Sequence, residues 1–329
     1  MDSITQAALG AVIGGVCVPA PQRRLGLAAG AVLGTLPDLD VLIDYGDAVA
    51  NFTRHRGFSH SLLVLAPFSV SLWLLLRRWW APVRSAPRHW LAAISLVLLS
   101  HPLLDAHTAY GTQLFWPLDT PPVSWSTLFI IDPLYTLPLL AAVLVAVFRP
   151  RAARTTRVMG AALVLSTAYI GWSWVAKSLV QQELDKALAL HGLHNRPVFT
   201  TPTYFNTLLW RVVVLDGDGY LEGFDSLLIE EAELHLQRHD SDTAALQAAT
   251  EVAAVSRLQW FARGFNRARV DGDLLLITDL RMGQEPYYAF THVAARRGNP
   301  HWTPVVTETR QPAYPSSLLN LTWRRIFSE

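Results

Sequence analysis

Long apolar stretches alternate with short polar segments over residues 1–180. Residues 57–76 supply in full, and residues 158–176 almost in full, the roughly 20 apolar residues that a helix needs to cross the hydrocarbon core of a bilayer. The shorter apolar stretches are residues 4–20, 25–37, 89–104 and 133–148. The first two of these are rich in Gly and Ala, which let membrane helices pack closely. The pattern predicts an all-α polytopic membrane domain of about five or six helices over residues 1–180.

The pattern changes near residue 180. Residues 181–329 predict a smaller, strand-rich α+β soluble domain. The runs "VVVLDGDGYLEG" and "ARVDGDLLLI" each place an Asp-Gly turn between β-branched or aliphatic residues, which predicts two β-hairpins. Residues 241–265, between the two runs, are typical of a helix, with Ser241 or Asp242 as its N-cap.

Composition supports a membrane location for the first part of the chain. Hydrophobic residues make up 51% of the 329 residues and charged residues only 16%, whereas a soluble domain has about 25% charged residues. The net charge of +1 argues against nucleic acid as a partner. The single cysteine, Cys17, excludes an intramolecular disulfide framework and a multi-cysteine metal site.

Arginines concentrate in alternate loops between the apolar stretches. They are Arg23, Arg24, Arg77, Arg78, Arg84, Arg88, Arg149, Arg151, Arg154 and Arg157. Because basic loops of membrane proteins remain in the cytoplasm, we expect these loops there. The intervening loops, around residues 38–56 and 105–132, are then expected on the outer side, as is the C-terminal domain.

Histidines and carboxylates gather in the loops expected on the outer side. They are Asp38 and Asp40 in "LPDLD", His55 and His60 in "RHRGFSH", His101 and Asp105 in "SHPLLDAH", and Asp132 in "IIDPLY". This pattern and the arginine pattern rest on different residues. Their agreement indicates one site at the outer face.

The residue types in these segments predict a metal centre. His101 and Asp105 are four residues apart, so a helix puts both on one face, one turn apart. Imidazole and carboxylate are ligands of zinc, and of manganese and iron in hydrolases. We expect one or two divalent ions, with zinc as the first choice and manganese or iron as alternatives.

A metal centre beside arginines favours hydrolysis of an anionic substrate. Divalent ions activate water and stabilise the charge of a phosphoester. Arg54 and Arg56 flank His55 and are expected to hold phosphate oxygens. Asp132, or another carboxylate that contacts a metal ligand, is the predicted general base.

Two other functions remain open on the sequence. A non-catalytic membrane protein could use the metal only to tie helix ends together, and a lone His–Asp pair one turn apart could be a structural hydrogen bond. A metal or proton transporter needs polar groups through the depth of the membrane. The stretches at 57–76, 133–148 and 158–176 have almost no polar groups in the middle, which disfavours transport.

Several motifs together resemble a known family. They are "MDSITQAALGA" at the start, "GTLPDLD" at 34–40, "HRGFSHS" at 55–61, "SHPLLDAHTAYGTQLFWP" at 100–117 and "DPLY" at 132–135. In this order they resemble the YdjM-like family of bacterial inner-membrane metal-dependent hydrolases, over roughly residues 1–180. Gln6 stands where some members have His, so the resemblance implies no metal ligand at position 6.

The resemblance implies a polytopic α-helical protein of the bacterial inner membrane with a divalent metal centre. The metal ligands that it implies are Asp38, Asp40, His55, His60, His101 and Asp105. We therefore expect cleavage of a phosphoester, in a lipid-linked or small anionic substrate, at the periplasmic face. Membrane lipids are the expected partners.

Overall fold

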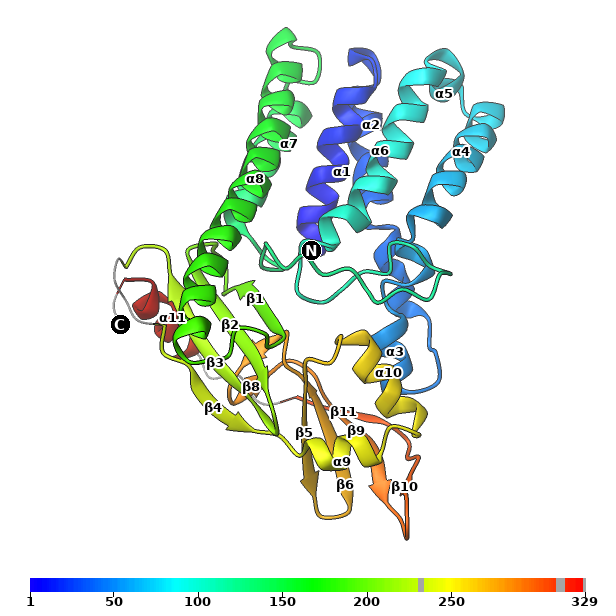
Figure 1. Cartoon of the computed structure of the whole chain (residues 1–329). Coiled ribbons are helices and arrows are strands. Elements are labelled where there is room, and N and C mark those ends of the chain that lie inside the picture. Colours follow the sequence, from blue (N-terminus) through cyan, green and yellow to red (C-terminus); the bar gives the residue numbers. More distant parts are fainter. Residues whose placement is uncertain (230–233, 312–316, 328–329) are drawn as a thin grey trace. The chain divides into compact units, whose positions relative to one another are not determined.

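The computed structural model describes residues 1–229, 234–311 and 317–327 of the chain. The chain forms two compact units (Figure 1). Unit 1 comprises Met1–Leu42, Arg56–Trp125 and Ile130–Ser173. Unit 2 comprises Ile43–His55, Ser126–Phe129 and Trp174–Glu329. The N-terminal region is helical and the C-terminal region is rich in strands, as the sequence predicts.

Unit 1 is a bundle of helices. Its α-helices are α1 (Ser3–Cys17), α2 (Arg23–Thr35), α4 (Leu62–Trp79), α5 (Ala81–Ser85), α6 (Pro87–Asp105), α7 (Pro133–Phe148) and the first part of α8 (Ala153–Leu190). Its 3-10 helices are η1 (Ala20–Gln22), η2 (Pro37–Leu42) and η3 (Phe58–His60). Each apolar stretch found in the sequence overlaps one of the α-helices, and the stretch at 133–148 coincides with α7. The stretch at 57–76 does not form one helix from its start, because η3 occupies Phe58–His60 and α4 begins only at Leu62.

Two helices of the described residues, α4 and α8, are long and apolar enough to cross a membrane. Helices α1 and α7 are also apolar, but each has fewer than 18 residues. At 1.5 Å per residue, the 15 residues of α1 span about 22 Å, less than the roughly 30 Å of a hydrocarbon core. The crossing of the membrane by all six predicted helices therefore stays a prediction.

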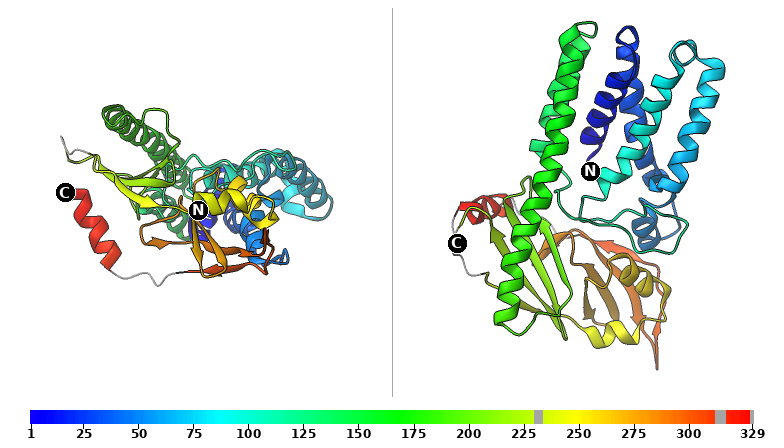
Figure 2. Two further views of the ribbon diagram at one scale, coloured as in Figure 1. Left: turned by 60° about the horizontal axis from the view of Figure 1, so that its bottom comes forward. Right: turned by 45° about the horizontal axis from the view of Figure 1, so that its top comes forward.

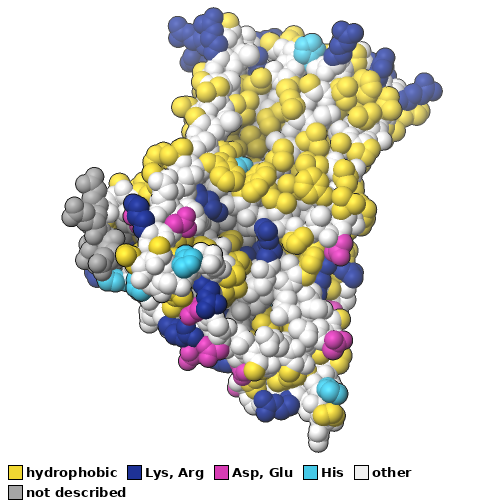
Figure 3. All heavy atoms as spheres, in the orientation of Figure 1, with side chains coloured by type: hydrophobic (Ala, Val, Ile, Leu, Met, Phe, Trp, Pro, Cys, Tyr) yellow, Lys and Arg dark blue, Asp and Glu magenta, His cyan; other side chains and the backbone are white. Residues whose placement is uncertain are grey.

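The loops rich in arginine and the segments with histidines and aspartates lie at opposite ends of the unit 1 bundle. The loops between α1 and α2, between α4 and α6, and between α7 and α8 are at one end (Figure 1). Their arginines form the group of dark blue side chains beyond the apolar surface of the helices in Figure 3. The end of α2, the start of α4, the end of α6 and the start of α7 meet at the other end.

Glycines hold α1 and α2 in backbone contact. A Cβ atom on Gly10 would lie 2.2 Å from the carbonyl oxygen of Gly30, and one on Gly30 would lie 2.0 Å from that of Gly10. Gly14 and Gly26 meet in the same way one turn further along. Only residues without a side chain permit this approach. The contact fixes the end of α2, and with it the carbonyl group of Gly34, against α1.

Helix α8 begins in unit 1 and continues into unit 2. The helix runs on to Leu190, past the change of pattern near residue 180. Within unit 2 its side chains Ala176, Val180 and Leu184 are buried in a cluster with Trp210 and Val212. The second part of α8 is therefore the helical cover of a sheet.

Unit 2 contains two antiparallel sheets and a short hairpin. The first sheet has the order β1 (Val198–Pro202), β2 (Leu209–Asp216), β3 (Gly219–Ser226) and β4 (Gln237–Asp240). The second has the order β10 (Trp302–Thr303), β9 (Thr291–Arg297), β6 (Leu274–Asp279) and β5 (Asn266–Asp271), and β11 (Glu308–Arg310) also pairs with β9. The hairpin is β7 (Gly283–Gln284) with β8 (Tyr287–Tyr288).

Both predicted hairpins are confirmed. Strands β2 and β3 are joined through Gly217 and β5 and β6 through Gly272, each with a positive φ that glycine adopts without strain. The helix expected at 241–265 is two short helices, α9 (Thr243–Ala248) and α10 (Ala253–Phe261), and Asp242 is the N-cap. The remaining helices of unit 2 are α3 (Ala48–Arg54) and α11 (Ser317–Phe327).

Candidate metal centre

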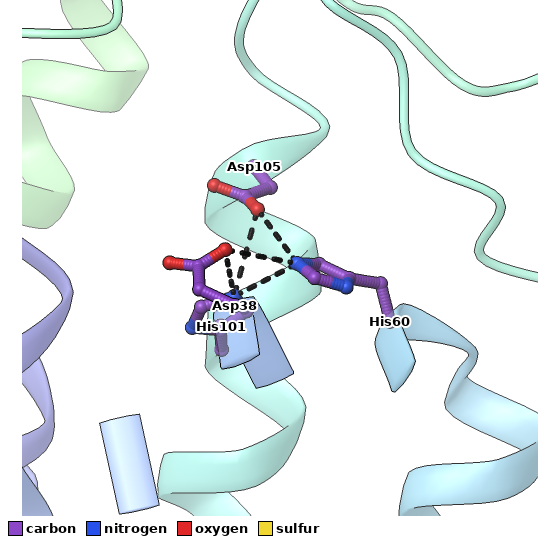
Figure 4. Close-up of side chains that lie close together, drawn as sticks. All are labelled: Asp38, His60, His101 and Asp105. Atoms are coloured by element: carbon purple, nitrogen blue, oxygen red, sulfur yellow. Dashed lines mark hydrogen bonds and ion pairs between the residues drawn. The ribbon is translucent and has the colours of Figure 1, made fainter. Parts of the chain in front are cut away.

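Two histidines and two aspartates meet at the end of unit 1 that lacks the arginine loops (Figure 4). Asp38 lies in η2, just after α2, and His60 is the last residue of η3, just before α4. His101 and Asp105 lie one turn apart on α6, and both are buried. One donor atom from each residue lies within 4.8 Å of the other three.

The spacing of the donor atoms fits a tetrahedral ion. The Nε2 atom of His60 lies 3.0 Å from Nε2 of His101, 3.3 Å from Oδ1 of Asp38 and 3.2 Å from Oδ2 of Asp105. Nε2 of His101 lies 3.4 Å from Oδ1 of Asp38 and 3.5 Å from Oδ2 of Asp105. Four ligands at about 2.0–2.1 Å from a zinc ion would be about 3.3 Å apart. Five of the six distances between donor atoms therefore fit a four-coordinate ion of this size, and the sixth, between Asp38 and Asp105, is within 4.8 Å.

A buried carboxylate oxygen supports the same conclusion. Oδ2 of Asp105 is buried and has no hydrogen-bond partner among the described residues. Nε of Arg56 and Nε2 of His60 each lie 3.2 Å away as ion-pair contacts, without the geometry of a hydrogen bond. A buried carboxylate oxygen whose lone pairs accept no hydrogen bond is costly. A cation between the four donor atoms would satisfy it.

Both imidazoles are held through their other ring nitrogen. Nδ1 of His101 donates a hydrogen bond to the carbonyl oxygen of Gly34 at 2.6 Å, so Nε2 keeps its lone pair toward the cluster. Nδ1 of His60 lies 2.9 Å from Oγ of Ser59, which donates to Oδ2 of Asp40 at 2.6 Å. Contacts of this kind fix the tautomer and the orientation of histidines that bind metal.

The other oxygen of Asp105 is held by the start of the chain and by α1. Oδ1 accepts hydrogen bonds from the amino group of Met1 and from Nε2 of Gln6, the latter at 3.0 Å. Nε2 of Gln6 also donates to the carbonyl oxygen of His101 at 3.2 Å. Gln6 therefore orients a candidate ligand and contributes no donor atom to the cluster.

Asp38 and His60 favour an ion pair with each other. Burial alone would raise the pKa of the Asp38 carboxyl, but its hydrogen bonds with His101 and His60 outweigh burial and lower that pKa. Burial alone would lower the pKa of His60, but the neighbouring carboxylates of Asp105 and Asp38 raise it. A metal ion that binds here competes with a proton on this pair.

Two other expected ligands lie outside the group of four. Oδ2 of Asp40 accepts hydrogen bonds from Ser59 and from the backbone nitrogen of Arg56, the latter at 3.0 Å. His55 is the C-cap of α3 and belongs to unit 2. Direct binding of the metal by Asp40 or His55 stays a prediction.

Arg56 contacts a candidate ligand. Its guanidinium lies beside Asp105, its Nη1 donates to Oγ1 of Thr108 at 3.0 Å, and it packs 5.0 Å from the ring centroid of Tyr110. Its backbone has a φ of 59°, which is uncommon for a residue with a side chain. Arg54 lies in α3 of unit 2, 5.5 Å from the ring centroid of Tyr45.

Asp132 is the N-cap of α7. Its side chain accepts hydrogen bonds from the backbone nitrogens of Leu134 and Tyr135 and from the hydroxyl of Tyr169 at 3.0 Å. Burial raises the pKa of its carboxyl despite these hydrogen bonds. Its role as a general base stays a prediction.

Sequence reasoning missed three groups that orient the cluster. Ser59 directly precedes His60, and a hydroxyl next to a histidine was the only signal for it. Gln6 gave a weaker signal, a polar side chain in an apolar helix. The carbonyl oxygen of Gly34 has no side-chain signal at all.

Comparisons with known proteins agree with a membrane protein. The chain is 39% identical over 115 residues to the inner membrane protein YbcI of Escherichia coli K12, a match that covers 34% of this chain and 64% of YbcI. It is 27% identical over 150 residues to the uncharacterized protein YfhP of Bacillus subtilis 168, covering 44% of this chain and 45% of YfhP. The chain thus spans less than two thirds of the length of either relative. No solved structure matches the chain.

The helical half of the chain corresponds to one family. A family model described as the YdjM inner membrane protein matches residues 1–180, which include α1 to α7, most of α8 and all four residues of the cluster. The match covers more than half of the 329 residues. The chain therefore belongs to the YdjM family of inner membrane proteins.

Proposed function

We propose that this protein is a multi-pass metal-dependent hydrolase of the bacterial inner membrane. Its substrate in this proposal is a phosphoester, in a lipid-linked or small anionic molecule. The site opens on the periplasmic face. The observation that carries the proposal is the group of four donor atoms from Asp38, His60, His101 and Asp105, spaced as the ligands of one ion.

The donor set suits a hydrolytic ion. Two imidazoles and two carboxylates, without a thiolate, are ligands that zinc, manganese and iron all accept. A divalent ion held there would supply Lewis acidity toward water and toward a phosphoryl group. The side chain of Asp38 is 19% exposed while those of the other three are fully buried. In this proposal the substrate reaches the cluster on the Asp38 side.

The surrounding residues would hold this arrangement. Gly34 and Ser59 aim the two imidazoles, and Gln6 and Arg56 hold Asp105. We assign Arg56 the positioning of Asp105. In this proposal Arg54 and Arg56 also bind the substrate anion.

The polarity of the bundle supports the proposed orientation. Arginine loops lie at one end of unit 1 and the His/Asp cluster at the other (Figures 1 and 3). By the positive-inside rule the arginine end belongs in the cytoplasm. All six apolar helices then span or enter the membrane.

A structural role of the ion is the second candidate. Zinc sites with four protein ligands are typically structural, whereas catalytic sites keep one position open for water. The group of four matches the first description by its number of ligands. In this case the ion would only tie α2, α4 and α6 together.

One experiment separates the two functions. Full-length protein in lipid nanodiscs is analysed for bound metal and assayed with a water-soluble phosphodiester and with a fluorescent phospholipid. His101→Ala is compared with His89→Ala, because His89 is an exposed histidine of the same helix. We expect metal and turnover in the wild type and in His89→Ala, and neither in His101→Ala or after chelation.

The outcomes differ clearly. A wild type without stoichiometric metal would overturn the metal centre itself. Stoichiometric metal with no turnover of either substrate, together with a lower melting temperature after chelation, would establish the structural role instead.

A further inference from the structure

The last described helix, α11, has one face packed on the sheet of unit 2. Leu318, Thr322 and Ile326 are buried and form a stripe with a spacing of four residues. Oγ of Ser226, at the end of β3, donates a hydrogen bond to the carbonyl oxygen of Ile326 at 2.8 Å. The guanidinium of Arg325 lies 4.0 Å from the ring centroid of Phe224. The helix is thus anchored to the end of β3.

A second stripe of α11 is apolar and exposed. Leu319, Trp323 and Phe327 also have a spacing of four residues, so they lie on one face of the helix next to the buried stripe. They are 43%, 56% and 67% exposed. A contiguous apolar stripe with two large aromatic side chains marks a contact surface on a protein. The described part of the chain leaves this stripe uncovered.

The strand register of unit 2 shows at which end of the first sheet α11 is anchored. Unit 2 begins its part of α8 at Trp174, directly after the apolar stretch of a candidate membrane span. From that point α8 runs to Leu190. The chain then returns in β1, which pairs with β2 and ends at Pro202, opposite Trp210. Leu209, which precedes Trp210 in β2, pairs with Ser226 of β3, so Ser226 lies at the same end of the sheet as Pro202.

Ser226, and with it the end of α11, is therefore at the end of the sheet from which α8 leaves for the membrane. Two views of the chain show α11 beside this sheet (Figure 2). In β3, Leu221 joins the α8 cluster, whereas Phe224 and Ser226 contact α11. Side chains alternate along a strand, so α8 and α11 lie on opposite faces of the sheet.

Other exposed apolar side chains lie at the same end of unit 2. Leu228 follows Ser226 by two residues, and Trp174, Val175 and Leu179 lie on the first turns of the unit 2 part of α8. Tryptophan beside arginine is typical of the boundary between headgroups and acyl chains. Arg324 and Arg325 lie in the last turn of α11.

We propose that α11 lies in the surface of the membrane that α8 crosses, with Leu319, Trp323 and Phe327 inserted among the lipids. Interfacial helices place their apolar face about 5–10 Å into the headgroup and acyl boundary. The positive charge of the last turn favours anionic headgroups. This inference rests on membrane crossing by α8 and is independent of catalysis.

A lipid surface fits the stripe better than a second copy of the chain. A stable protein interface buries about 800 Å² on each partner, which three partly exposed side chains do not supply. A bilayer needs no complementary shape, and α8 already places this end of unit 2 at its surface.

The experiment uses full-length protein in nanodiscs containing phosphatidylglycerol. Cys17→Ser removes the single cysteine, and Trp323→Cys or Asp218→Cys is then labelled with an environment-sensitive fluorophore. Asp218 is 80% exposed in the turn between β2 and β3, at the opposite end of this sheet from Ser226, so it is the matched control. Quenching is measured with a lipid carrying a nitroxide on its acyl chain and with aqueous iodide.

We expect the label at 323 to emit at shorter wavelength, to lose intensity with the nitroxide lipid and to resist iodide. The label at 218 is expected to behave in the opposite way. Equal quenching at the two positions would overturn the proposal. Self-quenching at 323 that rises with the number of copies per disc would instead establish an interface between chains and would also overturn it.

Discussion

The Nε2 atoms of His60 and His101 face each other at 3.0 Å. Each ring has its Nδ1 atom engaged elsewhere, by Ser59 and by Gly34. In the neutral rings both Nε2 atoms then carry lone pairs, which repel at this distance. A proton or a metal ion between them removes the repulsion, so the pair forms a site for a cation.

Substituting a glycine far from the cluster should weaken it. A Cβ atom in Gly30→Ala meets the carbonyl oxygen of Gly10 at 2.0 Å, so α2 has to move away from α1. Overpacking of this kind costs about 1–3 kcal/mol. The shift also moves the carbonyl of Gly34 away from His101. We expect a lower melting temperature and a lower zinc content, measured on purified protein.

Gly160→Ala is the control for that variant, since nothing lies within 4 Å of the Cβ atom it adds. It should keep its metal and melt no lower than the wild type. Equal zinc content in Gly30→Ala and Gly160→Ala would contradict the link between the α1–α2 contact and the site.

Ser59→Ala should reduce metal affinity without removing a ligand. The hydroxyl joins Nδ1 of His60 to Asp40, and loss of such an outer contact costs about 10–100-fold in affinity. Competition with a zinc chelator of known affinity measures the change. Ser178→Ala, which alters an exposed serine of α8, is the control. An unchanged affinity in Ser59→Ala would show that Asp40 and Ser59 do not support His60.

Asp132→Asn separates capping from proton transfer. Asparagine is as good an N-cap as aspartate, so the melting temperature should stay close to that of the wild type. A general base contributes about 10²–10⁴-fold to a rate, and an amide cannot replace it. We expect a loss in this range in the phosphodiester assay. Full activity in Asp132→Asn would restrict Asp132 to its role at the start of α7.

The proposed orientation is testable with reporters that distinguish the two sides of the membrane. A fusion after Arg84, in an arginine loop of unit 1, should report the cytoplasm. A fusion after Glu329 should report the periplasm. The reverse pair of results would place the His/Asp cluster on the cytoplasmic side.

Unit 2 should lose stability in mild acid because of His292. Burial lowers the pKa of His292 to about 4, below the value of about 6.5 for an unfolded chain. Between these values the unfolded state binds more protons, so stability is complete above pH ~6.5 and falls as the pH drops toward 4. The full loss is on the order of 3 kcal/mol.

Hydrogen exchange of β9 in the full-length protein at pH 7.5 and pH 5 measures this effect. His292→Gln should show a smaller difference between the two pH values than the wild type. His301→Gln changes an exposed histidine of the same unit and should match the wild type. The same pH difference in all three proteins would remove His292 as the cause.

Local patterns in the sequence predicted most of the helices and part of the site. The pairing of His101 with Asp105 follows from helix geometry alone, and the structure brings both into the cluster. The hairpins followed from their Asp-Gly turns. In these cases neighbours in sequence determine the structure.

The rest of the site depends on contacts that no local pattern records. His55 and His60 are close in sequence, yet they belong to different units, and the left-handed backbone of Arg56 lies between them. Nothing about an arginine predicts that conformation. The hydrogen bond from His101 to Gly34 spans 67 residues and uses a backbone atom, so only the folded bundle reveals it.

The four donors also fix an order of events during synthesis. Asp38 and His60 are 22 residues apart, and His60 and His101 are 41 apart, so the ion has no complete site until α6 has been made and has joined α2 and α4. The glycine contact between α1 and α2 needs no metal, because it joins the backbones of the two helices directly. An ion that uses all four donors would therefore bind only after α2, α4 and α6 have packed together.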